Sequence, residues 1–185
     1  ITAMYPDAVE MVSTQVKAKH AVLEGEAVAI DAESGEIKSF QTLMRRRRKH
    51  RIEEMAEKFP IAVFLFECLY VDGEDLTLEP YTKRRGMLQN IVEETDRFKL
   101  VRALQTSEVS QLVDFFEEAI SDGTEGLVVK STSEDSIYRA GARSWLWVKL
   151  KASYQSKMVE PVDLVVVGAF HGRGRRAGRY GALLM

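Results

Sequence analysis

Two lysines near residue 150 have the spacing of a phosphate-binding pair. Residues 147–151 read WVKLK, so one residue separates Lys149 from Lys151. Alternate side chains of a β-strand point to the same face, so both ammonium groups could enter one pocket. There they would neutralise a polyphosphate and the negative charge that develops during phosphoryl-type transfer. The alternative is a pair of solvated lysines that contribute only solubility.

Two segments concentrate positive charge. Residues 45–51 carry six Lys and Arg, residues 171–179 carry four, and neither contains an acid. The whole chain has 26 basic and 28 acidic residues, so the remainder holds 16 against 28, a net charge of −12. Basic patches on an acidic body are typical of a protein that binds a polyanion. The alternative is a solvated helix face for the first run and a turn for the second.

Four segments in order combine charged residues with apolar strands. They read LEGEAVA at 23–29, FLFECLYVDG at 64–73, EGLVVK at 125–130 and WVKLK at 147–151. In order and spacing they resemble the motifs of the nucleotidyltransferase superfamily that contains DNA ligases, RNA ligases and mRNA capping enzymes. Taken singly, each has an ordinary explanation, such as a solvated Glu26, a core Phe66 or an edge strand that begins at Gly126. Their joint order favours the resemblance.

The resemblance implies a nucleotide site. Phe66 would stack on adenine, because a flat ring suits a purine face and stacking contributes roughly 1–3 kcal/mol per base. Glu26 and Glu125 would lie near the ribose and phosphates, where Mg²⁺ bridges acids to phosphate. The implied ATP-binding residues are Glu26, Phe66, Glu125, Lys130, Lys149 and Lys151, with Glu26 and Glu125 as metal ligands and with Lys149 and Lys151 stabilising charge in catalysis.

The resemblance to DNA ligases in particular comes from other segments. Residues 163–168 and the arginine-rich turn at 172–181 resemble the opening of the OB-fold domain in archaeal and eukaryotic replicative-type ligases. Residues 40–43 (FQTL), followed by arginines, resemble a region that these ligases press on DNA. Arginine contacts to phosphates position a duplex without reading its sequence. The implied DNA-binding residues are Phe40, Arg45, Arg46, Arg47, Arg48, Arg173, Arg175 and Arg176.

The implied activity is ATP-dependent sealing of nicks in duplex DNA, as in replication, repair and recombination. AMP passes from ATP to an enzyme lysine, then to the 5′-phosphate of the nick, and the 3′-hydroxyl displaces it. The expected cofactors are ATP and Mg²⁺, and the partners are nicked double-stranded DNA and a sliding clamp. A monomer is expected, in the cytoplasm of an archaeon or in the nucleus of a eukaryote.

The sequence departs from the superfamily pattern in ways that affect what this chain can do. The nucleophile belongs to a K-x-D-G motif, and no lysine here is followed two residues later by Asp-Gly. Only Thr2 and Tyr5-Pro6-Asp7 match the stretch R-x-x-E-x-x-T-x-x-YPD. We therefore expect the nucleophile upstream in the natural protein, and a chain that cannot adenylate itself. Glu67 stands where the family usually has Asp, which leaves the adjacent polar contact open.

Other functions fit parts of the pattern. An mRNA capping guanylyltransferase would prefer GTP, and an RNA ligase shares the superfamily motifs, but the arginine turn favours a DNA ligase. From another class, a non-catalytic DNA-binding module would keep the fold without the chemistry. A K-x-D-G motif ahead of Ile1 would exclude that module.

Periodicity predicts the elements that must position these residues. The continuous apolar run at 61–71 predicts a strand in the centre of a sheet, and apolar spacing between 43 and 59 predicts that the arginine run opens a helix. Other expected elements are helices at 82–92 and 109–120 and strands at 21–31, 37–40, 98–103, 126–130, 146–150, 163–170 and 179–185. Without strict β-α alternation, the fold class is α+β, with mostly antiparallel sheets and flanking helices.

Composition and Pro161 set the domain organisation. We expect an adenylation domain lacking its N-terminal part at 1–160, followed at 161–185 by the first strands of an OB-fold β-barrel. Apolar residues at 45% and charged residues at 29% exclude a disordered chain. No apolar run approaches the roughly 20 residues of a membrane-spanning helix. The single cysteine, Cys68, is expected to be a buried small hydrophobe.

Overall fold

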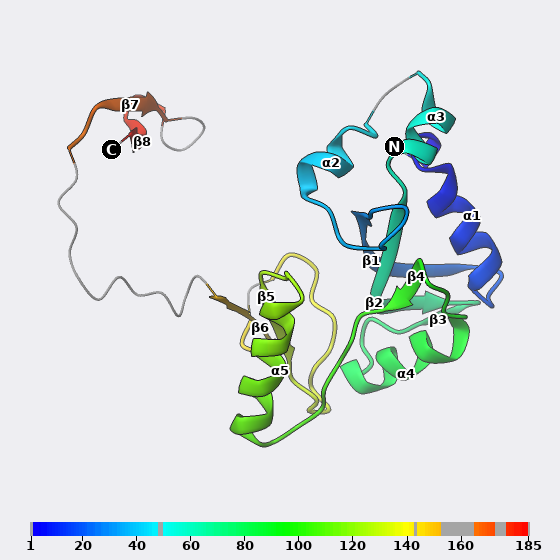
Figure 1. The fold of residues 1–185 in the computed structure, drawn as a ribbon. Coiled ribbons are helices and arrows are strands. Elements are labelled where there is room, and N and C mark those ends of the chain that lie inside the picture. Colours follow the sequence, from blue (N-terminus) through cyan, green and yellow to red (C-terminus); the bar gives the residue numbers. More distant parts are fainter. Residues whose placement is uncertain (1, 48–49, 143, 153–164, 173–176, 185) are drawn as a thin grey trace. The chain divides into compact units, whose positions relative to one another are not determined.

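The chain divides into two compact units, Ile1–Lys151 and Ala152–Met185 (Figure 1). A computed structural model describes residues 2–47, 50–142, 144–152, 165–172 and 177–184. The division precedes the predicted boundary between residues 160 and 161, and residues 153–164 lie outside the described part of the chain.

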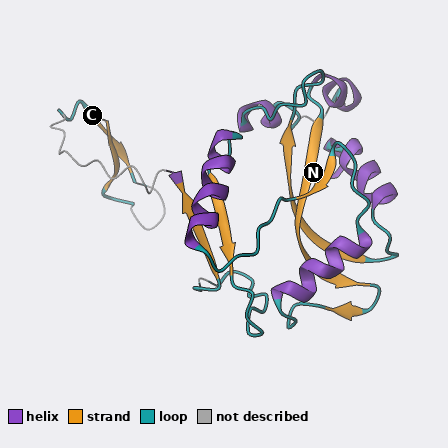
Figure 2. Cartoon of the chain, turned by 60° about the horizontal axis from the view of Figure 1, so that its bottom comes forward, coloured by secondary structure: helices purple, strands orange, loops and turns teal. Residues whose placement is uncertain are grey.

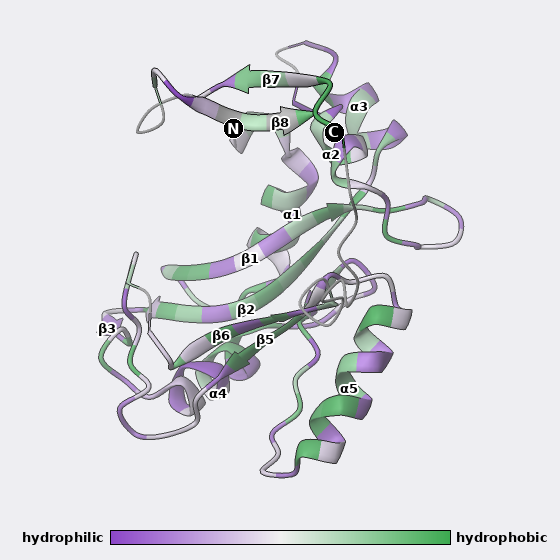
Figure 3. Ribbon diagram, turned by 90° about the vertical axis from the view of Figure 1, so that its left-hand side faces the viewer, coloured by the Kyte–Doolittle hydropathy of each residue, from purple (hydrophilic) through white to green (hydrophobic). Residues whose placement is uncertain are grey.

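The first unit is built on a four-stranded sheet with β2 (Ile61–Val71) at its centre. β2 pairs antiparallel with β1 (Ala21–Ala29) and β3 (Glu74–Asp75), and parallel with β4 (Phe98–Leu100). Its uninterrupted run of apolar residues suits a strand covered on both faces. Figure 3 shows it as hydrophobic along most of its length. The predicted central strand is therefore confirmed.

Helices pack around this sheet. The 3-10 helix η1 (Thr2–Met4) and helices α1 (Pro6–Gln15), α2 (Phe40–Met44) and α3 (Ile52–Lys58) precede β2 in the chain, and α4 (Tyr81–Ile91) follows β3. α1 and α4 pack against β2, and α2 packs beside β1. The core between α4 and the sheet contains Ile61, Val63, Leu65, Cys68, Leu76, Leu88, Ile91 and Phe98.

The rest of the first unit is a hairpin with one helix. β5 (Gly126–Lys130) pairs antiparallel with β6 (Trp147–Lys151), and α5 (Val109–Ser121) packs against β5. Figure 2 shows α5 running alongside this pair of strands. All three elements agree with the predicted ranges to within one residue. Together with the central sheet they confirm the α+β class with flanking helices.

Two predictions about the region before β2 are wrong. The arginine run does not open a helix, because Arg51 has a left-handed backbone (φ 59°) that cannot continue a right-handed helix, and α3 begins only at Ile52. The return strand at 37–40 is reduced to one bridge between Ile30 and Ile37, since Phe40 already begins α2. Helix α1 has no counterpart among the predicted elements.

The second unit contains an antiparallel pair, β7 (Gly168–His171) and β8 (Tyr180–Leu184). The amide of Gly172 donates a hydrogen bond of 2.8 Å to the carbonyl of Arg179 at the end of this pair. A strand pair around a Gly/Arg turn was predicted here, and its assignment to an OB-fold stays a prediction. No helix in the described part of the chain is long and apolar enough to cross a membrane.

Candidate functional site

The β5–β6 hairpin gathers three lysines on one face. Lys130 lies opposite Trp147, Val128 opposite Lys149 and Gly126 opposite Lys151. Directly opposed residues of an antiparallel pair share a face, and alternate residues of each strand do so too. Lys130, Lys149 and Lys151 therefore share one face of the hairpin, which confirms the prediction that Lys149 and Lys151 point the same way.

Gly126 is required by the packing of this hairpin. Its φ is 142°, and a Cβ built on it would lie 2.0 Å from the carbonyl oxygen of Leu150. The backbone of Gly126 comes this close to the neighbouring strand β6, so the lack of a side chain at Gly126 sets the spacing of the two lysine-bearing strands.

Glu125 and Lys151 form an ion pair at the start of the hairpin. Lys151 Nζ lies 2.7 Å from Glu125 Oε2, and the glutamate side chain is 86% exposed. The hydrogen bond from Lys151, with a further contribution from its charge and that of Lys149, lowers the pKa of Glu125. This acid is therefore ionised at neutral pH and accessible from solvent, as a ligand for a hydrated metal ion must be.

Lys130 occupies a different environment from the other two lysines. Its side chain is 10% exposed, and its Nζ lies 3.0 Å from Glu67 Oε2. The same Nζ sits over three aromatic rings, 4.4 Å from the centroid of Trp147, 4.5 Å from Tyr81 and 5.6 Å from Phe66. Desolvation lowers the pKa of Lys130, and the charge of Glu67 opposes that effect. Lys130 therefore connects the hairpin to Phe66.

Phe66 lies at an irregularity in the β1–β2 pairing. Glu24 is opposite Glu67 and Gly25 is opposite Leu65, so Phe66 is an extra residue without a partner on β1. Such a bulge re-aims the side chain of the extra residue. Glu26 is the next residue on β1, lies opposite Phe64 and is exposed. The neighbouring acid Glu24 accepts a hydrogen bond from the hydroxyl of Tyr138.

Sequence reasoning missed Arg84. This residue is fully buried on α4 and contacts both carboxylate oxygens of Glu67, at 2.8 Å from Nε and 3.2 Å from Nη2. The sequence did not determine which polar group the side chain of Glu67 contacts. In the structure its carboxylate forms ion pairs with two cations, Arg84 and Lys130. A signal was present, because Arg84 lies on the same helical face as the apolar Leu88 and Ile91, where a solvated arginine is not expected.

The first arginine run divides into exposed and buried members. Phe40 is 65% exposed, and Arg45 and Arg47 are exposed. Arg46 is buried and holds Asp7 with two hydrogen bonds, from Nη1 at 2.7 Å and from Nη2 at 2.8 Å, while its guanidinium lies 4.9 Å from the ring centroid of Tyr5. The prediction that Arg46 contacts DNA is wrong for this conformation, because the side chain is enclosed by the Tyr-Pro-Asp segment.

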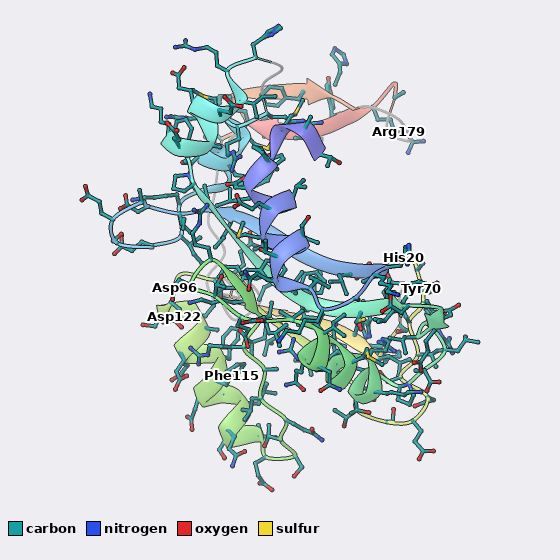
Figure 4. The ribbon with its side chains drawn as sticks, turned by 90° about the vertical axis from the view of Figure 1, so that its right-hand side faces the viewer. His20, Tyr70, Asp96, Phe115, Asp122 and Arg179 are labelled. Atoms are coloured by element: carbon teal, nitrogen blue, oxygen red, sulfur yellow. The ribbon has the colours of Figure 1, made fainter. Side chains whose placement is uncertain are left out.

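The remaining arginines of the predicted interface all lie outside the described residues. This is the case for Arg48, Arg173, Arg175 and Arg176. Arg179 is described and exposed, and Figure 4 shows its position beside the β7–β8 pair. On the first unit the same figure labels Phe115 on α5 and Asp122, the residue after α5. Arg102 pairs with Asp122 at 3.0 Å, and its guanidinium lies 5.3 Å from the centroid of the Phe115 ring.

Comparison with known proteins gives a consistent result. A family model described as "ATP dependent DNA ligase domain" matches residues 1–151. Proteins named DNA ligase from Hyperthermus butylicus and Aeropyrum pernix are each 52% identical over all 185 residues, which span 30% and 31% of their lengths. This chain therefore spans less than a third of these relatives.

Solved structures show the same likeness. A mycobacterial DNA ligase D complexed with ATP and MES aligns with a TM-score of 0.55 and 29% identity, covering 82% of this chain and 44% of that one. The ligase domain of LigD from M. tuberculosis aligns with a TM-score of 0.56 and 29% identity, covering 81% and 44%.

Proposed function

Because this chain belongs to the family of ATP-dependent DNA ligase domains, we propose that it contributes the nucleotide site of an enzyme that seals nicks in duplex DNA. The observation that carries the proposal is the contact of Lys130 with Phe66. It joins the hairpin face bearing Lys149 and Lys151 to the strand bearing the adenine-stacking candidate. A stacking ring and a cationic strand pair in one unit suit a purine nucleotide polyphosphate.

Each residue of the site then has a distinct task. Phe66 stacks on adenine, and Lys149 and Lys151 neutralise phosphates. Lys130 is paired with the fully buried Glu67 and its side chain is only 10% exposed, whereas Lys151 is 36% exposed, so the contribution of Lys130 is to hold the edge of the adenine site rather than to bind phosphate by itself. Two ammonium groups near the α-phosphate also stabilise the charge that develops when AMP is transferred.

The acids fit a magnesium ion that is held mainly by the nucleotide. Among the described residues there is no cluster of three or more His, Cys, Asp or Glu side chains that could enclose a metal. Mg²⁺ commonly uses one or two carboxylates together with substrate phosphates and retained waters. Glu26 and Glu125 are both exposed and fit that pattern. Bound there, Mg²⁺ would supply charge neutralisation at the phosphates.

ATP titration tests the nucleotide site. No lysine in the 185 residues lies in a K-x-D-G motif, so the readout for this chain is non-covalent binding and no AMP should remain after denaturation. Phe66→Ala should weaken ATP binding by roughly 5- to 150-fold, the equivalent of about 1–3 kcal/mol of stacking. Phe115→Ala on α5 is the matched control and should leave the affinity unchanged. Equal affinity of the Phe66 variant and the control would remove Phe66 from the site.

Salt dependence tests the DNA interface. We propose that Phe40, Arg45 and Arg47, with Arg48, Arg173, Arg175 and Arg176, contact the duplex backbone. Each phosphate contact contributes about 0.9 to the slope of log K against log salt. Replacing Arg45 and Arg47 with alanine should therefore flatten the slope by up to about two units. Arg102→Ala is the control, because Arg102 is an exposed arginine outside the predicted interface that pairs with Glu118 and Asp122. An unchanged slope in the double variant would refute the assignment.

A further inference from the structure

Arg84 connects three separate segments of the first unit. Its Nε and Nη2 bind Glu67 on β2, and its Nη1 donates to two carbonyl oxygens, those of Glu79 at 2.5 Å and Ser136 at 2.8 Å. Glu79 precedes α4, whereas Ser136 belongs to the segment between β5 and β6. An arginine has five N–H donors in a fixed planar arrangement, so one side chain can fix several acceptors at once.

The charges around Arg84 balance. Arg84 and Lys130 supply two positive charges, and Glu67 lies between them with contacts to both. Glu24 adds a second carboxylate near Lys130, and its charge opposes the lowering of the Lys130 pKa by desolvation. A buried ion pair is tolerated only when its hydrogen-bonding groups are satisfied and its charges compensated. Removing Arg84 would leave Lys130 as the one cation paired with Glu67 among the residues that the structure describes, and it would remove a hydrogen bond to the Ser136 carbonyl.

The segment between β5 and β6 is docked on the sheet by the same set of contacts. Besides the bond from Arg84 to Ser136, the amide of Tyr138 donates to the carbonyl of Thr77 at 2.8 Å, and the hydroxyl of Tyr138 donates to Glu24. The Tyr138 ring lies edge-on to Trp147, at 5.5 Å between centroids. Trp147 is two residues from Lys149. The position of the lysine hairpin therefore depends on contacts that Arg84 organises.

We propose that Arg84 is a positioning residue of the nucleotide site. It acts through Glu67 and the Ser136 carbonyl, setting the placement of Lys149 and Lys151 relative to the Phe66 ring, and it does not itself contact the nucleotide. This inference rests on the proposed function of the site. It differs from a purely stabilising role, because it requires ATP affinity to fall while the unit remains folded.

The experiment measures ATP affinity and hairpin position in the same variants. The chain has two tryptophans, so Trp145→Phe leaves Trp147 as the single fluorescent indole. In that background, Arg84→Met removes the guanidinium, and Arg84→Lys keeps a charge but loses the two-pronged contact. Arg46→Met is the matched control, because Arg46 is an equally buried arginine with a two-pronged carboxylate contact elsewhere in the unit.

We expect Arg84→Met to weaken ATP binding about tenfold, the lower end of the losses found when groups that orient metal-ligating side chains are removed, and to shift Trp147 emission to longer wavelength. Arg84→Lys should recover part of both effects, and Arg46→Met should show neither although it lowers stability. If Arg84→Met does not fold, Arg84→Lys carries the comparison.

Three results would overturn the inference. The first is ATP affinity equal to the parent in a folded Arg84 variant. The second is an equal loss of affinity in Arg46→Met, which would assign the effect to general destabilisation. Failure of the parent chain to bind ATP at all would overturn the proposed function itself, and it is distinguishable because it needs no substitution.

Discussion

Gly126→Ala should disrupt the lysine hairpin more than the same substitution at any other glycine whose surroundings the structure describes. The added Cβ would lie 2.0 Å from the Leu150 carbonyl oxygen and 2.9 Å from the Lys151 Cα. Carbon and oxygen atoms rarely approach closer than about 3.3 Å without bonding. The neighbouring strand must therefore move away by about 1 Å at the position where Lys151 pairs with Gly126.

The expected cost has two parts. Holding alanine at a φ of 142° costs about 1–3 kcal/mol of backbone strain. Overpacking against a backbone that cannot rotate away adds about 1–3 kcal/mol. Together the free energy of unfolding should fall by roughly 2–6 kcal/mol. Displacement of Lys151 should also weaken ATP binding.

The variant Gly123→Ala separates the cost of backbone strain from the cost of overpacking. Gly123 also has a positive φ, 86°, but no described atom lies within 4 Å of the position of its Cβ, so only strain applies. Thermal unfolding, at roughly 2–4 °C per kcal/mol, and ATP titration of both variants make the measurement. If Gly126→Ala were no less stable than Gly123→Ala and bound ATP equally well, the argument that Gly126 sets the strand spacing would be refuted.

Three further predictions follow from the pKa shifts. The pKa of Asp31 is lowered by the backbone N–H of Ser34 first, then by the Lys38 ammonium and the backbone N–H of Glu33. The parent chain should therefore be more stable than Asp31→Asn by a full margin above about pH 4, and this margin should vanish as the pH falls further. A margin that persists in acid would contradict this. Burial raises the pKa of Cys68 to about 11, so a thiol reagent at neutral pH should label it only at the rate of unfolding, and rapid labelling of the folded chain would exclude its burial. The hydrogen bond that Tyr138 donates to Glu24 raises the pKa of Tyr138 to about 12. Tyr138→Phe should therefore lower the urea midpoint by a constant amount up to about pH 10, and the difference should disappear as the pH approaches the pKa of Tyr138 in the folded chain. Equal midpoints at pH 7 would refute the hydrogen bond.

The sequence was sufficient to predict a strand or helix wherever its local pattern and its tertiary environment agreed. β2 is a continuous apolar run and lies in the centre of its sheet, and the strands carrying Lys130 and Lys149 were located to within one residue. The common face of Lys149 and Lys151 follows from strand periodicity alone, so no tertiary information was needed. What could be predicted of the site was therefore the part that lies within single strands.

Contacts between distant segments could not be predicted in this way. Arg46 and Arg84 both stand in basic stretches, and a basic stretch is ordinarily solvated. Asp7 precedes Arg46 by 39 residues and Glu67 precedes Arg84 by 17, so neither acid occurs at the spacing that marks a helical ion pair. The prediction of a helix across the arginine run was wrong for a related reason. Arg51 adopts a left-handed backbone conformation, which the spacing of apolar residues does not reveal.

The length of the Glu67 side chain explains how one acid serves both cations. Its Oε1 accepts a hydrogen bond from Arg84 Nε, and its Oε2 accepts hydrogen bonds from Arg84 Nη2 and Lys130 Nζ. The carboxylate therefore lies between helix α4 and strand β5. An aspartate on the same backbone would hold its carboxylate about 1.5 Å closer to β2, one carbon–carbon bond length, and could not keep both sets of contacts unless α4 or β5 moved inward. Glutamate at this position is therefore matched to the spacing between Arg84 on α4 and Lys130 on β5. The same spacing sets how far the lysine face of the hairpin stands from Phe66.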